Sequence, residues 1–180
     1  MVELLNDFDA SYSFIENIGT NFYFHTDLKA PRYRVIAIDV TKPARENWRE
    51  IIPEGADKLD SVSCVDGQLL CKSLKDARSA MVAYDLEGKK LHDIELPGIG
   101  TVGGFGGKRS DKITHYAFTS FTTPGAIYRY DVATGKSTLW KQPRVDFDAS
   151  PYETKQVFVK SKDGTKVPMF IVHKKGLKLD

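Results

Sequence analysis

The chain has 180 residues, of which 41% are hydrophobic and 28% are charged, and these values are those of an ordinary globular protein. Lysine and arginine number 26 against 24 aspartate and glutamate residues, so the formal net charge is +2. A balance this close to neutral gives no reason to expect nucleic acid or an anionic membrane as a partner.

The N-terminal stretch carries no recognisable targeting signal. Met1–Asn6 lacks the basic start and apolar centre of a secretory signal. No window approaches the ~18 apolar residues that would predict a membrane-spanning helix. The chain has two cysteines and no Asn-X-Ser/Thr acceptor, whereas small secreted domains are often rich in disulfides. Together these observations favour a reducing, cytoplasmic location.

The first predicted element is a short strand at Val2–Leu5, and a repeat follows it. Three apolar runs share one ending, an aspartate followed by an aliphatic residue. The runs are Val35–Val40, Met81–Leu86 and Ile127–Val132, and their aspartates, Asp39, Asp85 and Asp131, are 46 residues apart. A fixed period of this length is typical of repeat architectures.

Each repeat contains four short runs rich in Val, Ile, Phe and Tyr, bounded by turn residues, and this pattern predicts strands. In the first repeat, at about residues 7–53, we expect Tyr12–Asn17, Thr20–Thr26, Tyr33–Val40 and Trp48–Ile52. The second, at about 58–97, has Leu59–Val65, Gln68–Leu74, Ala80–Leu86 and Leu91–Leu96. The third, at about 98–141, has Gly100–Phe105, Ile113–Ser120, Ala126–Val132 and Ser137–Trp140. Four strands in a repeat of ~40–50 residues match a β-propeller blade. Residues 1–145 are therefore predicted to form a partial β-propeller of about three blades plus one extra strand.

Glycines mark the predicted turns. Asp66-Gly67, Glu87-Gly88 and Thr134-Gly135 lie between strand pairs, where a positive φ angle is needed and glycine adopts it readily. A glycine cluster at residues 103–107 ends a predicted inner strand, where neighbouring blades crowd together. It does not resemble a phosphate-binding loop, because neither Lys-Ser/Thr nor a helix follows it.

The period breaks after Trp140. Residues 142–151 are rich in breakers and predict a linker. A β-hairpin is expected next, with strands Thr154–Lys160 and Val167–His173 around an Asp163-Gly164 turn. Because no fourth repeat follows, residues 146–180 are predicted to be a linker and the first hairpin of a different domain.

Three stretches carry a family resemblance that extends over essentially the whole chain. They are Ala30–Arg34, Phe118–Tyr128 and, most specific of all, Ser161–Gly176, with the sequence SKDGTKVPMFIVHKKG. Together they resemble the prolyl oligopeptidase (prolyl endopeptidase) family of serine peptidases. The resemblance implies that the chain is a fragment. It would hold the last three of seven propeller blades, the last strand of the blade before them, and a hairpin that opens an α/β-hydrolase domain.

The resemblance also implies a function for the parent protein, which would cleave short peptides after proline with a Ser-Asp-His triad. An α/β-hydrolase nucleophile lies in a Gly-X-Ser-X-Gly turn, and no such motif occurs in this chain. No residue matches a catalytic residue of the family. We therefore expect no catalytic, cofactor-binding or metal-binding residue, and a chain that is inactive alone. Its role would be a lid that restricts access, with inner strands Tyr12–Asn17, Leu59–Val65 and Gly100–Gly104 lining a central channel. Its partners would be the remainder of the same peptidase and short proline-containing peptides.

A non-enzymatic alternative stays open, because propellers host many functions and a truncated propeller could be a protein-interaction module. A reading frame that continues past Asp180 into a Gly-X-Ser-X-Gly segment would exclude it, whereas a natural terminus there would favour it. Under either hypothesis, three blades cannot close a ring. Exposed apolar faces drive association, so the isolated chain is expected to oligomerise or aggregate.

Lone histidines and cysteines are the remaining candidates for chemistry. The histidines, His25, His92, His115 and His173, are far apart and have no partner at metal-site spacing, so we expect structural or surface roles. Cys64 and Cys71 flank an Asp-Gly turn and are predicted to lie on adjacent strands. Their spacing does not suit a zinc site. Buried free thiols are expected, with a redox pair as the alternative.

The repeated aspartates, Asp39, Asp85 and Asp131, are expected to accept hydrogen bonds from the turns that follow them rather than to bind a ligand. Trp48 and Trp140 lie on outer strands and are expected to be packing residues. They are not expected to stack on the bases of a nucleic acid, because no basic groove accompanies them. The basic cluster at Lys174, Lys175 and Lys178 is expected to be a solvated surface feature.

Overall fold

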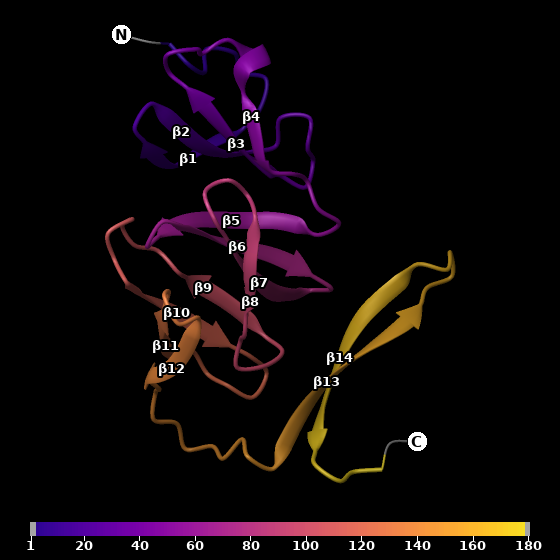
Figure 1. The fold of residues 1–180 in the computed structure, drawn as a ribbon. Helices are drawn as coiled ribbons and strands as arrows, with labels where there is room; N and C mark the ends of the chain where they lie inside the picture. Colours follow the sequence, from indigo (N-terminus) through magenta and orange to yellow (C-terminus); the bar gives the residue numbers. More distant parts are fainter. Residues whose placement is uncertain (1–2, 179–180) are drawn as a thin grey trace.

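The computed structural model describes residues 3–178, and these are organised almost wholly as β-strands (Figure 1). Fourteen strands form three four-stranded antiparallel sheets and one separate hairpin. Within the described range, the only helical segment is a 3-10 turn at Arg45–Asn47, and no helix is long and apolar enough to cross a membrane. The expected all-β architecture is confirmed.

Each four-stranded sheet is a meander in which consecutive strands pair. Sheet 1 contains β1 (Tyr12–Ile18), β2 (Asn21–Thr26), β3 (Arg34–Asp39) and β4 (Arg49–Ile52). Sheet 2 contains β5 (Lys58–Val65), β6 (Gln68–Lys75), β7 (Arg78–Tyr84) and β8 (Lys90–Ile94). Sheet 3 contains β9 (Thr101–Gly104), β10 (Ile113–Thr119), β11 (Ala126–Asp131) and β12 (Lys136–Lys141). Every strand predicted for these sheets is present, with each end shifted by no more than two residues.

Apolar side chains fill the seams between neighbouring sheets. Because successive side chains of a strand point to opposite faces, Leu69 packs against sheet 1 and Leu70 against sheet 3. Seam 1, between sheets 1 and 2, buries Tyr23, Val35, Ile51, Leu59 and Leu69 among others. Seam 2, between sheets 2 and 3, buries Leu70, Met81, Phe105, Tyr116 and Tyr130 among others.

The predicted turn glycines adopt the conformation for which they were expected. Gly67, Gly88 and Gly135 have φ angles of +68°, +83° and +68°. Asp66, which precedes Gly67, also has a positive φ of 49°. Two successive residues with positive φ allow β5 and β6 to be joined by a tight two-residue hairpin turn.

The segment before β1 departs from the prediction. Val2 lies outside the described residues, and Glu3–Leu5 is not a strand. No described strand runs beside this segment to share ladder hydrogen bonds with it. Instead Leu4 and Leu5 pack against the free apolar face of sheet 1, beside Phe24. The prediction of a strand at Val2–Leu5 is therefore wrong for its described residues.

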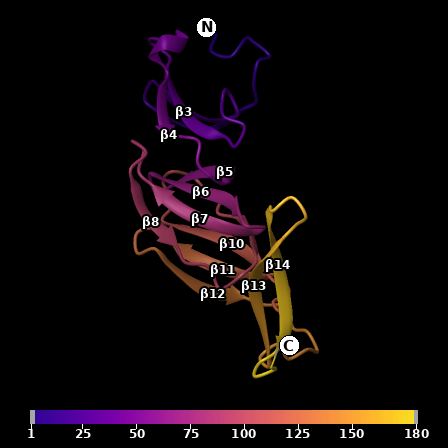
Figure 2. The same ribbon diagram turned by 90° about the vertical axis from the view of Figure 1, so that its right-hand side faces the viewer.

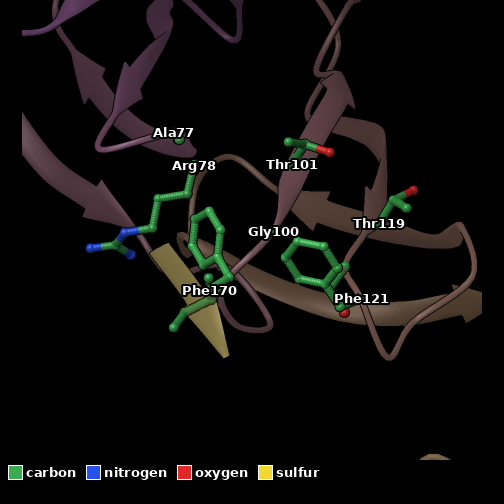
Figure 3. Close-up of a pocket in the computed structure, with 9 residues that line it drawn as sticks. Ala77, Arg78, Gly100, Thr101, Thr119, Phe121 and Phe170 are labelled. Carbon is green, nitrogen blue, oxygen red and sulfur yellow. The ribbon is translucent and has the colours of Figure 1, made fainter. Parts of the chain in front are cut away.

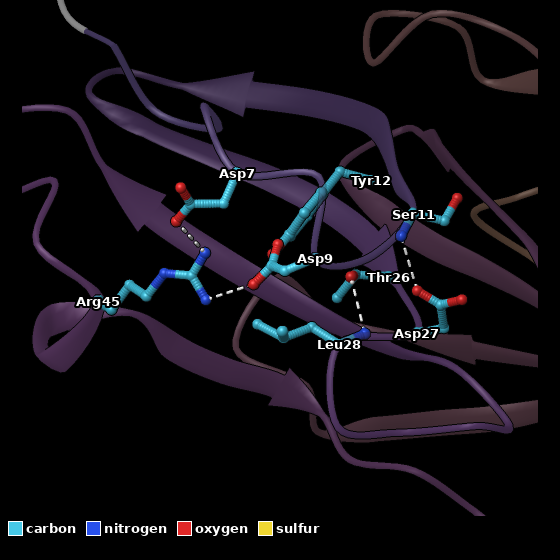
Figure 4. A network of polar contacts seen from close by, with 8 residues as sticks. All are labelled: Asp7, Asp9, Ser11, Tyr12, Thr26, Asp27, Leu28 and Arg45. Carbon is cyan, nitrogen blue, oxygen red and sulfur yellow. Dashed lines mark hydrogen bonds and ion pairs between the residues drawn. The ribbon is translucent and has the colours of Figure 1, made fainter.

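A polar network ties the following residues to sheet 1 (Figure 4). The guanidinium of Arg45 lies 3.1 Å from a carboxylate oxygen of Asp7 and 2.7 Å from one of Asp9. The hydrogen bond from Arg45 lowers the pKa of Asp9. The backbone N–H of Ser11 donates to Asp27 at 2.7 Å. These contacts fix the approach of the chain to β1.

The remaining strands, β13 (Tyr152–Lys160) and β14 (Lys166–Lys174), form the predicted hairpin. They pair without interruption from Tyr152 opposite Lys174 to Lys160 opposite Lys166. Gly164 in the turn has a φ of +84°. The hairpin lies beside sheets 2 and 3 in both views of the molecule (Figures 1 and 2).

Candidate functional site

The loops between the second and third strands of each sheet gather on the side of the stack where the hairpin lies (Figure 1). In sheet 1 this loop spans residues 27–33, in sheet 2 it is Asp76-Ala77, and in sheet 3 it spans residues 120–125. Two of the three stretches that carry the family resemblance overlap two of these loops: Ala30–Arg34 overlaps the loop of sheet 1, and Phe118–Tyr128 contains that of sheet 3. This side is therefore the candidate functional face.

Two contacts dock the hairpin on this face. The side-chain amide of Gln156, on β13, donates a hydrogen bond of 2.6 Å to the backbone carbonyl of Asp76. The ring of Phe170, on β14, lies 5.5 Å from the ring of Phe121, measured between centroids. One contact joins the hairpin to sheet 2 and the other to sheet 3, so the hairpin bridges both sheets.

A cavity of about 250 Å³ lies beneath these contacts, lined mainly by apolar groups (Figure 3). Phe121 and Phe170 form one side, and the ends of β7 and β9 contribute Arg78 and Thr101. The guanidinium of Arg78 extends away from the two rings in Figure 3. Its Nε atom is buried and has no hydrogen-bond partner among the described residues. The cavity offers shape and apolar contact but contains no nucleophile paired with a base.

Gly100 allows the close approach of chains beside this cavity. A Cβ atom at this position would lie 2.4 Å from the carbonyl oxygen of Thr119 and 2.7 Å from the ring of Phe118. Neither group is free to move, since one is backbone and the other is a buried core ring. Glycine is therefore required where β9 begins.

Phe121 also meets the linker that precedes the hairpin. A second cavity of about 230 Å³ is lined by Phe121, Pro124, Val145 and Phe147. Phe121 is 65% exposed and stands between the linker on one side and β14 on the other. The sequence patterns do not indicate this role for Phe121, Gln156 or Phe170. Their contacts join residues far apart in the chain, and no local pattern signals them.

The inner strands β1, β5 and β9 are edge strands, each paired with one neighbour within its sheet. Ser63 on β5 donates a hydrogen bond of 2.6 Å to the carbonyl of Phe105, which directly follows β9. Gly104 has a φ of +113°, and a Cβ there would lie 2.8 Å from the carbonyl oxygen of His115. Gly104 therefore allows the close approach of β9 to β10, whereas a Cβ at Gly103 or Gly106 would meet nothing within 4 Å. The channel that these strands were expected to line stays a prediction.

Two of the four histidines lie in the seams between sheets. Nε2 of His25 is 2.9 Å from the carbonyl oxygen of Leu59, across seam 1. Nε2 of His92 is 2.9 Å from the hydroxyl of Tyr130, across seam 2. Burial lowers the pKa of His25, and it raises the pKa of Tyr130 to about 12. Both histidines have the structural role that was expected.

The other two histidines are also in structural positions. His115 packs its ring against Trp140, with centroids 5.1 Å apart. Nδ1 of His173 is 2.8 Å from the carbonyl oxygen of Lys174, and its Nε2 lies 3.6 Å from the carboxylate of Glu153. Across residues 3–178, the structure contains no group of three or more His, Cys, Asp or Glu side chains that could hold a metal ion.

Cys64 and Cys71 lie on the paired strands β5 and β6, as predicted, and both are free and buried. In the register Cys64 is opposite Leu69 and Cys71 is opposite Val62, so the two thiols are diagonal neighbours. Burial raises the pKa of Cys64 to about 11 and that of Cys71 to about 12. Thiols held in the protonated form are weak nucleophiles, which agrees with the structural role rather than a redox one.

The three repeated aspartates all accept hydrogen bonds from the turns that follow them, as predicted. Asp39 accepts the backbone N–H of Thr41 at 2.9 Å. Asp85 accepts two backbone N–H groups, those of Glu87 and Lys89. Asp131 accepts the N–H of Thr134 at 3.0 Å. The backbone hydrogen bonds lower the pKa values of Asp39 and Asp131.

The tryptophans differ from one another. Trp48 packs edge-on against Tyr12 at 6.2 Å and donates its indole N–H to the carbonyl of Pro43, so its packing role is confirmed. Trp140 contacts His115 but remains 61% exposed, because β12 is the outer edge strand of sheet 3. The basic cluster at Lys174, Lys175 and Lys178 is exposed, as expected.

Three meanders of the same design, packed face to face with inner edge strands on one side, define part of a β-propeller. A family model described as "Prolyl oligopeptidase, N-terminal beta-propeller domain" matches residues 1–143. The chain therefore belongs to the prolyl oligopeptidase family. Both the family resemblance and the partial propeller fold predicted from the sequence are confirmed.

Similar proteins agree with this assignment. The chain is 36% identical over 179 residues to a prolyl endopeptidase from Elizabethkingia miricola, covering 99% of this chain and 25% of that protein. It is 36% identical to a prolyl endopeptidase from Dictyostelium discoideum, covering 96% of this chain and 24% of that protein. The apo structure of prolyl oligopeptidase B from Galerina marginata superimposes with a TM-score of 0.87 at 32% identity, covering 98% of this chain and 26% of that one.

A further solved structure comes from a study of two prolyl endopeptidases and the role of inter-domain dynamics in their catalysis and specificity. It superimposes with a TM-score of 0.83 at 45% identity, covering 97% of this chain and 26% of that one. The chain thus spans about a quarter of the length of the relatives it matches.

Proposed function

We propose that the chain is part of a serine endopeptidase that cleaves short peptides after proline. The chain would be the propeller lid, and residues outside 1–180 would supply the Ser-Asp-His triad. The observation that carries this proposal is the family match over residues 1–143, together with relatives that are named prolyl endopeptidases. No Gly-X-Ser-X-Gly turn occurs in the 180 residues, so the proposal assigns the nucleophile elsewhere.

We divide the chain into a lid, residues 1–145, and a linker with the first hairpin of the hydrolase domain, residues 146–180. The exposed side chains of the hairpin support this division. Phe158, Met169 and Val172 are 49%, 41% and 43% exposed. Apolar side chains gathered on one two-stranded element favour burial against further structure. Gln156 and Phe170 would then join the hydrolase domain to the lid.

The proposed lid acts by size. Strands β1, β5 and β9 lie at the inner edges of the three sheets, where a completed ring would leave a narrow channel. A flexible peptide can pass or thread into such a space, whereas a folded domain would first have to unfold. Because the free energy of unfolding of a domain is typically ~5–15 kcal/mol, folded proteins would be excluded without any specific contact. We also propose a cytoplasmic location, for which the free, buried Cys64 and Cys71 are the supporting observation.

The test compares two polypeptides: residues 1–180 alone, and the longer protein that carries them. We expect the longer protein to hydrolyse a fluorogenic Gly-Pro substrate, to leave the matched Gly-Ala substrate intact, and to be blocked by a serine-hydrolase inhibitor. Residues 1–180 alone should show no inhibitor-sensitive hydrolysis. Activity of the short chain would refute the assignment of the triad, and an inactive longer protein would support the interaction-module alternative.

The lid role needs a separate measurement. The longer protein should cleave a short proline-containing peptide rapidly and a folded protein with an exposed proline loop slowly or not at all. A variant that lacks residues 1–145 but keeps its hydrolase domain folded should lose this discrimination. Equal discrimination by both proteins would contradict the lid role while leaving the peptidase assignment intact.

A further inference from the structure

Seam 1 is closed at one end by the backbone of a single residue, Leu59. Its N–H donates to the carbonyl of Arg32 at 2.8 Å, and its own carbonyl oxygen lies 2.9 Å from Nε2 of His25. Both partners belong to sheet 1. A β-bulge between Leu59 and Ser61 interrupts the pairing of β5 with β6 at this point. Leu59 is therefore held across the seam rather than only within its own sheet.

His25 is enclosed by groups from both sheets. Its residue exposure is 9%, and its ring stacks on Tyr33 with centroids 4.5 Å apart and planes 16° apart. The ammonium group of Lys58 lies 5.4 Å from the centroid of the same tyrosine ring. Because a carbonyl oxygen only accepts hydrogen bonds, the neutral imidazole carries its proton on Nε2.

The charged groups of β5 do not supply a free counter-ion for a protonated His25. Asp60 lies between Lys58 and Lys72, with N–O distances of 3.9 and 3.8 Å. Its negative charge is therefore shared by two ammonium groups. Lys58 itself disfavours a second positive charge nearby.

The groups contributed by sheet 1 do not supply one either. Asp27 faces the histidine but accepts the backbone N–H of Ser11. On the strands that flank β2, the residues opposite His25 are Ser13 and Val35, and neither titrates near neutral pH. The ion pairs found among residues 3–178 do not include His25. A positive charge on this ring would thus be largely desolvated and poorly compensated.

Burial is the largest influence on His25 and lowers its pKa from 6.5, against smaller opposing contributions from the Leu59 carbonyl, Asp60 and Asp27. When the seam opens, water reaches the ring and the penalty is removed. Protonation therefore favours the open form over the closed form, by linkage between proton binding and opening.

Seam 2 is closed at the start of its inner strand, β9, by a residue that does not titrate. Ser79, 46 positions after Tyr33, donates its N–H to the carbonyl of Gly100 at 3.0 Å. Its hydroxyl accepts the N–H of Val102 at 3.1 Å. His92 lies elsewhere in this seam and meets the hydroxyl of Tyr130, which can either donate or accept.

We propose that His25 is an acid-sensitive latch of seam 1. The protonated ring still donates its Nε2–H to the Leu59 carbonyl, but its charge is disfavoured in the buried, closed seam, so protonation opens the seam between the first two sheets while seam 2 stays closed. Acidification would then loosen one blade junction selectively. The open seam would expose the start of β5 and the apolar side chains that it covers. This inference does not depend on the proposed peptidase function.

The test is native-state hydrogen exchange in the protein that contains residues 1–180, with each rate divided by its intrinsic chemical rate. Peptides containing the Leu59 amide report on seam 1, and peptides containing the Val102 amide report on seam 2. Between about pH 7.5 and about pH 5.5, corrected exchange at Leu59 should rise by up to about tenfold per pH unit below ~6.5, the slope for one proton. Exchange at Val102 should not change.

Two variants separate the latch from general acid loosening. His25→Gln keeps an amide N–H that can reach the Leu59 carbonyl but does not titrate, so the rise at Leu59 should vanish. His92→Gln is the matched control in the other seam and should leave the rise intact. A flat response at Leu59 in the natural protein, an equal rise in both seams, or a rise that survives His25→Gln would each overturn the proposal. If His25→Gln does not fold, the comparison of the two seams in the natural protein decides alone.

Discussion

Three glycines of the chain share a backbone conformation but differ in what surrounds them, and they form a graded test of blade packing. Gly67, Gly135 and Gly88 have φ angles of +68°, +68° and +83°. A Cβ at Gly67 would meet nothing within 4 Å. At Gly135 it would lie 3.1 Å from Nε2 of His92, and at Gly88 only 1.8 Å from the carbonyl oxygen of Ile51. Gly135 and Gly88 each press a turn against the outer strand of the preceding sheet.

The expected magnitudes follow from these surroundings. Alanine at a positive φ costs about 1 kcal/mol, and all three variants carry this penalty. Gly67→Ala should therefore destabilise the fold by ~1 kcal/mol and no more. Gly135→Ala should cost slightly more, since the histidine tip can move. Gly88→Ala should cost a further ~1–3 kcal/mol, because only a shift of the turn or of β4 can relieve an overlap with backbone.

The assay must report on one region, because three packed sheets and a separate hairpin need not unfold in a single step. We choose the free energy of opening measured by hydrogen exchange at the slowest amides of β6, one of the two central strands of sheet 2 and the one that carries Leu69 and Leu70. All three glycines lie in sheet 2 or against it. Equal losses for the three variants, within ~0.5 kcal/mol, would refute the claim that blade contact governs the cost. A largest loss at Gly67 would do the same.

Four further outcomes are expected. Thiol reagents should leave Cys64 and Cys71 unmodified in native buffer at about pH 8, because their pKa values are about 11 and about 12, and label them only in denaturant; rapid native labelling would contradict this. Backbone hydrogen bonding lowers the pKa of Asp131 below 3.8. The hydrogen-bonded carboxylate therefore stabilises the fold above that pH, and this stabilisation is lost as the pH falls below it. An Asp131→Asn variant with an unchanged acid denaturation curve would argue against this stabilisation. Phe121→Ala should speed protease cleavage in the linker at residues 142–151 more than the control Leu91→Ala on β8, and equal rates would count against docking through Phe121. Residues 1–180 alone should self-associate in sedimentation, since the free face of sheet 1 exposes Phe14 by 56%, and a stable monomer would rule this out.

The strands could be predicted because the information that specifies them is local. Alternating apolar residues bounded by turn residues identify a strand within a few positions. Leu69 and Leu70 illustrate this: adjacent in sequence, they fill opposite seams, as the pleat requires. The hairpin at residues 152–174 could be predicted equally well, since Asp163-Gly164 marks its turn and a run of apolar residues lies on each side of that turn.

The candidate face could not be predicted to the same depth. Gln156 and Asp76 are 80 positions apart, and their hydrogen bond depends on how the linker directs the hairpin back over the sheets. Phe121 lies within a stretch that carries the family resemblance, yet nothing near it in the sequence points to Phe170. The strand expected at Val2–Leu5 failed for a related reason. A strand needs a neighbouring strand to satisfy its backbone hydrogen bonds, and an apolar run does not show whether such a neighbour is present.

The repeat separates two kinds of information. Asp39, Asp85 and Asp131 make the same turn contact in each blade because that contact lies wholly within one repeat, so the period predicts it. Seam contacts join different repeats, so the period does not predict them. His25 of β2 closes the first seam and Ser79 of β7 the second, at different positions of the repeat, although both act on the start of the next inner strand. The blades of a repeat can thus be alike while the seams between them differ. Because a histidine that titrates closes seam 1 and a serine that does not closes seam 2, acid would open the first seam and leave the second closed.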